Sequence, residues 1–80
     1  MNDHQESDHF AYNRTWDQIE IMLSKAESKR NDWWVKFHEA QERGNKKKVI
    51  IAARNIKALE GVIKTLRWVL GDMHITNPLN

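Results

Sequence analysis

Two runs of regularly spaced apolar residues, separated by one glycine–asparagine pair, most constrain the fold of this chain. Steps of three and four residues alternate from Trp16 to Ala40, with Arg30 as the one polar member, and again from Val49 to Met73 with no exception. This spacing places each run on one face of an α-helix, so the pattern predicts two long amphipathic helices. We call these positions the seam: Trp16, Ile19, Leu23, Ala26, Arg30, Trp33, Phe37, Ala40, Val49, Ala52, Ile56, Leu59, Ile63, Leu66, Leu70 and Met73.

The pair Gly44–Asn45 lies between the two runs. Gly favours the left-handed conformation that ends a helix, and Asn is a good N-cap for the next one. We therefore expect a tight turn between antiparallel helices, with Ala26 facing Ile63. A phosphate-binding loop would need more glycines and a preceding strand. One uninterrupted helix is the remaining alternative, because a single Gly costs only ~1 kcal/mol in a helix interior.

The predicted fold is all-α: two long antiparallel helices in a coiled-coil-like helical hairpin over residues 15–73. Helix one is expected over about 15–43, with Thr15 or Asn13 as its N-cap, then a turn at 44–45 and helix two over about 46–72. A flexible acidic N-terminal segment, 1–14, and a C-terminal tail, 74–80, flank the hairpin. An 80-residue chain buries only about 60–65% of its unfolded surface. Dimerisation into a four-helix bundle is therefore expected.

The composition indicates a cytoplasmic protein with no membrane partner. The chain has no Cys, so it has no disulfide framework, no Cys-based zinc site and no thiol nucleophile. Its first residues are polar and acidic, whereas a signal peptide is basic and then apolar. No apolar run approaches the ~18 residues of a membrane span.

Nothing in the sequence predicts catalysis, a metal site or a cofactor. The four His residues are scattered; His38 and Glu42 have the i,i+4 spacing that could hold a metal, but two ligands make a weak site. There is no Ser-centred motif and no Gly-rich loop after a strand. A thin hairpin also offers no enclosed cavity, so we expect the protein not to be an enzyme.

Apolar residues outside the seam indicate a second buried surface. They either widen the hairpin core or form an association surface, and the small size of the hairpin favours association. Trp33 and Trp34 point about 100° apart on a helix, so Trp33 is expected in the seam and Trp34 at an interface. The predicted protein interface consists of Met22, Trp34, Ile51, Ala58, Val62 and Val69.

Basic residues concentrate in the second half of the chain. Between Arg43 and Arg67 there are eight Lys and Arg residues and a single acid, Glu60. Such a row suits phosphate contacts, although most charged helix faces only solvate the protein. The residues predicted to contact a nucleic acid, if one binds, are Arg43, Lys46, Lys47, Lys48, Arg54, Lys57, Lys64 and Trp68.

Arg30 occupies a seam position where an apolar residue is expected. One polar residue in such a seam can set the register or the oligomeric state. Pairing with Glu27, or with Glu60 across the hairpin, would lower the cost of burying its charge. We interpret Arg30 as structural.

The heptads and the Gly44–Asn45 turn give a topology that resembles the Rop family of helical hairpins. This resemblance implies dimerisation into a four-helix bundle and RNA binding on one face. No Rop motif carries over residue by residue. The turn sequence ERGNKKK lacks the Pro-containing or Trp-x-Gly turns of secreted needle and WXG-type hairpins.

The sequence favours a non-enzymatic interaction protein that self-associates and binds a protein partner. An adaptor, accessory protein or inhibitor of the sort phages encode fits this description. The alternative is a nucleic-acid-binding module that contacts phosphates through the basic face of helix two.

Overall fold

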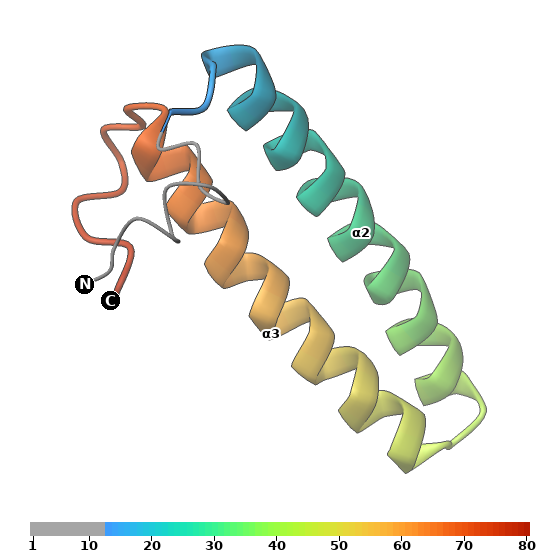
Figure 1. Ribbon diagram of the computed structural model, residues 1–80. Helices are drawn as coiled ribbons and strands as arrows, with labels where there is room; N and C mark the ends of the chain where they lie inside the picture. The colour runs from blue at the N-terminus through green and yellow to red at the C-terminus, as the bar shows by residue number, and fades with distance from the viewer. Residues whose placement is uncertain (1–12) are drawn as a thin grey trace, which may run out of the picture.

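The computed structural model describes residues 13–80, which form a helical hairpin. Helix α2 spans Trp16–Glu42, and helix α3 spans Lys46–Val69. The two helices run antiparallel and pack against each other (Figure 1), and no strand occurs in the described part of the chain. The predicted all-α hairpin is therefore confirmed. Residues 1–12 of the expected N-terminal segment lie outside the described residues.

Thr15 begins α2 through a reciprocal pair of hydrogen bonds. The backbone N–H of Gln18 donates to the Thr15 hydroxyl oxygen at 3.1 Å, and the Thr15 N–H donates to the Gln18 side-chain oxygen at 3.0 Å. This capping box satisfies two backbone donors that the first turn leaves unpaired. Of the two predicted N-caps, the structure selects Thr15.

The turn at Gly44–Asn45 closes one helix and opens the next. Gly44 has a φ of 67°, and its N–H donates to the Gln41 carbonyl at 3.1 Å. The Asn45 N–H donates to the Ala40 carbonyl at 2.9 Å, while the Asn45 side-chain oxygen accepts from the Lys48 N–H at 3.1 Å. The backbone bonds form a Schellman motif, and the side-chain bond is an N-cap. The predicted tight turn is thus present, and the single-helix alternative is wrong.

Helix α3 ends at Val69, three residues before its expected end at 72. Gly71 has a φ of 90° and forms a second Schellman motif, in which the Asp72 N–H donates to the Arg67 carbonyl at 2.9 Å. The apolar spacing continues through Leu70 to Met73 and so gave no sign of this stop. Backbone geometry at the glycine ends the helix before the apolar pattern does.

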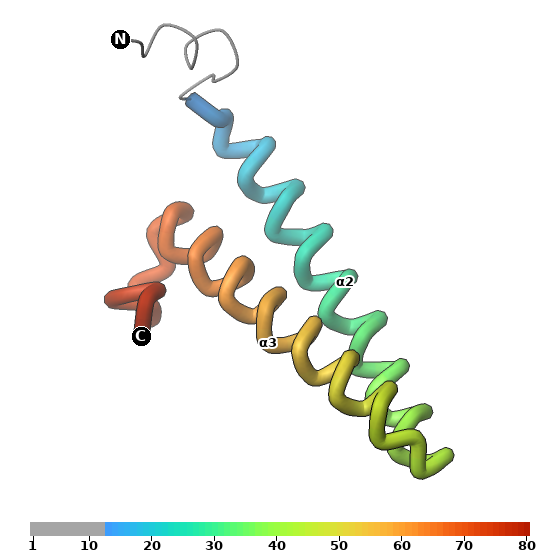
Figure 2. The backbone as a smooth tube through the Cα atoms, turned by 60° about the horizontal axis from the view of Figure 1, so that its bottom comes forward, coloured from blue at the N-terminus to red at the C-terminus, as the bar shows by residue number. Residues whose placement is uncertain are grey.

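The core of the hairpin is small. Its buried residues are Ala26, Ala40, Ala52, Ile56 and Ile63, all of them seam members. Ala26 and Ile63, the pair expected to face each other, are both among them. The helices lie close near the turn and diverge towards their other ends (Figure 2), where Trp16 and Met73 are exposed.

Arg30 lies half-buried in the seam, but the ion pair between the helices is formed elsewhere. The guanidinium of Arg67 in α3 binds the carboxylate of Glu27 in α2. Glu27 therefore pairs with Arg67 and not with Arg30, for which the sequence had suggested it as a partner.

Residues 72–80 return along the outer side of α3 (Figure 1). The backbone N–H of His74 donates to the Asp72 carboxylate at 2.9 Å and lowers the pKa of that carboxyl. Pro78 is half-buried over α3, and the Lys64 ammonium donates to the Asn80 carbonyl at 3.0 Å. The C-terminal tail is thus packed on the hairpin.

Candidate interaction surfaces

The hairpin exposes many large apolar side chains. Every one of them is more than a third exposed, and they lie on both helices and in the tail. They are Trp16, Ile21, Met22, Trp34, Val35, Ile50, Ile51, Val62, Trp68, Val69, Met73 and Leu79. Single exposed apolar residues are ordinary, but large contiguous patches mark binding surfaces. A binding surface is therefore indicated only where several of these residues lie side by side.

The seam divides the surface of the hairpin into two flanks. Trp34 follows Met22 by twelve residues, so the two side chains point about 120° apart around α2. Met22 lies beside Leu66 of α3 on one flank. On the other flank, Glu27 pairs with Arg67 of α3. Glu27 lies seven residues before Trp34 and therefore on the same side of α2 as Trp34. The structure therefore separates Trp34 from Met22, although the sequence grouped them in one interface.

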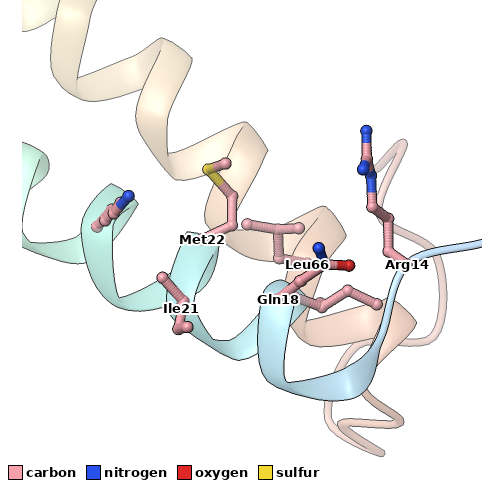
Figure 3. Close-up of a pocket in the computed structure, with 7 residues that line it drawn as sticks. Arg14, Gln18, Ile21, Met22 and Leu66 are labelled. Atoms are coloured by element: carbon pink, nitrogen blue, oxygen red, sulfur yellow. The ribbon is translucent and has the colours of Figure 1, made fainter.

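The first flank, which we call the grooved flank, has an apolar hollow near the diverging ends of the helices (Figure 3). Ile19, Ile21, Met22 and Leu66 supply its apolar surface, and the hollow encloses about 460 Å³. The other residues that line it are Arg14, Gln18 and Lys25. Two cations therefore border an apolar floor.

A second hollow, of about 430 Å³, lies on the grooved flank near the turn. Its apolar lining comes from Trp33, Ala40 and Ile51. Its polar lining consists of Lys36, Glu39, Arg43, Asn45 and Lys48. Both ends of this flank thus combine apolar surface with a basic rim.

The opposite side of the hairpin, which we call the Trp34 flank, carries a cluster of aromatic side chains and an ion pair. The Trp34 ring meets Phe37 edge-on at 5.3 Å between centroids and stacks on His38 at 5.7 Å. Trp34 is 38% exposed, whereas Trp33 is half-buried in the seam, as predicted for this pair. The Glu27–Arg67 ion pair lies on the same flank.

The α3 members of the predicted protein interface are Ile51, Ala58, Val62 and Val69, and none of them is buried. Ile51, Val62 and Val69 are exposed. Ala58 and Val62 line a shallow hollow together with Pro78 of the C-terminal tail. The tail therefore borders Ala58 and Val62 without burying them, and Ile51 lies in the hollow near the turn.

The predicted nucleic-acid contacts lie along α3 and at the turn. Within residues 13–80, Arg67 is the one Lys or Arg whose side chain lies within 4.0 Å of a carboxylate. Lys64 instead binds the Asn80 carbonyl. Trp68 is exposed and follows Lys64 by four residues, on the same side of α3. The remaining predicted contacts are Arg43, Lys46, Lys47, Lys48, Arg54 and Lys57, all exposed.

Sequence reasoning missed the basic edge that α2 contributes to the grooved flank. Lys25, Lys29 and Lys36 recur at steps of four and seven residues, beside the seam member Trp33. This spacing was visible in the sequence, but the flank to which it belongs depends on how the helices pack. Ile50, exposed on the Trp34 flank beside Gln41 and Lys46, was also not singled out.

Within residues 13–80, no group of three or more His, Asp or Glu side chains gathers where it could hold a metal ion. Neither described helix combines the length and the apolar character needed to cross a membrane. Comparisons with protein-family models, with curated proteins and with solved structures find no match to this chain.

Proposed function

We propose that this chain is a non-enzymatic interaction protein of the cytoplasm, a helical hairpin that self-associates and binds a protein partner as an adaptor or inhibitor. One observation carries the proposal: the buried residues within 13–80 are three Ala and two Ile, while Trp, Met and Val side chains remain exposed. A single core in a chain of this size rarely supplies more than about 3–5 kcal/mol even when it is well packed. A hairpin with so small a core gains stability when another molecule covers its apolar flanks.

Pairing of two hairpins through the Trp34 flank would form a four-helix bundle. On this flank α2 carries Glu20 and Glu27, while α3 carries Lys64, Arg67 and one acid, Glu60; Glu27 and Arg67 already pair within the chain. A two-fold arrangement that lays α2 of one copy on α3 of the other brings opposite charges together. Trp34 would then lie between the copies, where a partly exposed aromatic side chain contributes most.

Light scattering on a sizing column tests self-association, at low and at high salt. A dimer has twice the 9.5 kDa mass of the chain. Trp34→Ala should shift the mass towards the monomer, whereas the matched control Val35→Ala, at a neighbouring residue that is 58% exposed, should leave the dimer intact. The melting temperature should also rise with protein concentration.

A monomer whose melting temperature is high and independent of concentration would refute the proposal. It would show that the small core alone stabilises the hairpin and that the exposure of the apolar side chains is not evidence of association.

Nucleic-acid binding is the second candidate function, supported by the exposed cations of α3 that have no carboxylate partner within residues 13–80. Lys57→Glu with Lys64→Glu should abolish binding of a single-stranded oligonucleotide, and added salt should weaken it steeply. Binding that survives both changes would exclude the phosphate contacts of α3.

A further inference from the structure

The grooved flank pairs an apolar floor with a cationic rim at both of its ends. Within residues 13–80, five cations and one acid, Glu39, line the two hollows, and a second acid, Asp32, lies beside Lys25 and Lys29 on the same edge of α2. None of the five lies within 4.0 Å of a carboxylate in the described part of the chain. They are Arg14, Lys25, Lys36, Arg43 and Lys48. The Lys36 ammonium lies over the Trp33 ring, 4.4 Å from its centroid, and so stays at the edge of the apolar surface. An apolar surface that is edged by cations without carboxylate partners complements a ligand that is apolar along its middle and acidic along its edges.

We infer that the grooved flank binds an acidic amphipathic helix of a partner protein. The inference rests on the proposed function and deepens it by naming the chemistry of the partner. Recognition of this kind places apolar anchors of a helix into hollows of a groove, while charges on the rim set orientation and partner choice.

The spacing of the hollows suits a helix. Met22 in one hollow and Trp33 in the other are eleven residues apart, about 17 Å along α2. Eleven residues make three helical turns, so two anchors at this separation also fall on one face of a partner helix. The partner therefore needs apolar residues about eleven positions apart, with Asp or Glu beside them.

A second copy of this chain fits the grooved flank less well than an acidic helix does. Pairing this flank with itself would bring two cationic rims together, with Glu39 and Asp32 from each copy to offset five cations. A nucleic acid would satisfy the rim but not the apolar floor formed by Met22, Ile51 and Leu66. Both are outcomes that the experiment distinguishes.

The test uses the full chain and a fluorescein-labelled synthetic peptide of about 18 residues, with Leu at anchors eleven positions apart and Glu along both edges. Anisotropy measures binding, which should be micromolar. A matched peptide with Lys in place of Glu should bind about tenfold more weakly or not at all.

Two sets of protein variants test the two parts of the surface. Lys25→Glu with Lys36→Glu reverses the rim and should weaken binding about tenfold or more. Met22→Ala with Ile51→Ala removes the floor and should weaken it about tenfold. Met22 and Ile51 are 52% and 49% exposed, so their truncation should leave the hairpin folded, as circular dichroism would verify.

Matched controls change the outer side of α2, away from both hollows. Asn31→Glu adds a negative charge at an exposed residue, and Val35→Ala removes exposed apolar surface. Both should bind the acidic peptide within about twofold of the unmodified chain, because neither residue lines the grooved flank.

Several results would overturn the inference. These are equal binding of the acidic and basic peptides, unchanged affinity in both groove variants, or displacement of the peptide by a single-stranded oligonucleotide. A fall from dimer to monomer in the Met22→Ala and Ile51→Ala variant would assign this flank to a second copy instead. A large gain in affinity on neutralising the acids Asp3, Glu6 and Asp8 would assign it to the chain's own first residues.

The failure of this inference can be told apart from the failure of the proposed function. Loss of peptide binding with the dimer intact would remove the acidic helix as partner and leave self-association standing. A Trp34→Ala monomer that still binds the peptide would separate the two flanks, as we expect.

Discussion

Replacing Gly44 and Gly61 separately by Ala should change stability in opposite directions. An added Cβ meets no atom within 4 Å at either position, so packing does not decide the result. Gly44 has a φ of 67°, whereas Gly61 lies within α3. The left-handed conformation costs a non-glycine residue about 1–2 kcal/mol. In a helix interior, Ala is favoured over Gly by about 0.8–1.0 kcal/mol.

Gly44→Ala should therefore lower the free energy of unfolding by about 1–2 kcal/mol, and Gly61→Ala should raise it by about 1 kcal/mol. For a domain of this size, 1 kcal/mol corresponds to about 4–8 °C in melting temperature. Urea unfolding followed by circular dichroism measures both variants, at one fixed protein concentration because association also contributes to stability.

The sign of the Gly44→Ala effect decides between the turn and one continuous helix. If Gly44 were helical, Ala would stabilise the protein at both positions. An increase in stability on Gly44→Ala would thus refute the hairpin.

Three further predictions concern single contacts. Asn45→Ala should destabilise the hairpin by about 1 kcal/mol, because it removes the N-cap of α3, and an unchanged urea midpoint would contradict that role. A double-mutant cycle with Glu27→Gln and Arg67→Met should give a coupling below about 1 kcal/mol that shrinks with salt, since both side chains are about a third exposed or more. The pKa of Asp72 is lowered first by the His74 N–H, so its contribution to tail order is present above the ordinary value of 3.8 and is lost as pH falls through the lower folded-state pKa. An NMR titration of the Asp72 side-chain carboxyl carbon should show a midpoint below 3.8, and a midpoint at or above 3.8 would oppose this assignment.

The elements of this fold could be predicted because their causes are local. Spacing of three and four residues defines a helix face wherever it occurs, so the seam and the partition of Trp33 from Trp34 follow from the sequence. Gly44 and Asn45 interrupt the apolar pattern, which made their turn visible. Gly71 ends α3 by the same backbone mechanism, but the apolar spacing runs past it.

The sequence by itself determined two amphipathic helices, the turn between them and the angular position of each residue around its helix. Only the tertiary structure decided which sides of the two helices adjoin. That placement puts Met22 beside Leu66 on the grooved flank. It joins Glu27 to Arg67 on the opposite flank, where Trp34 also lies. It also lays Pro78 over α3. The apolar periodicity places each residue around the axis of its own helix. A flank of the hairpin is made of residues from both helices, so it is defined only by how the two helices pack.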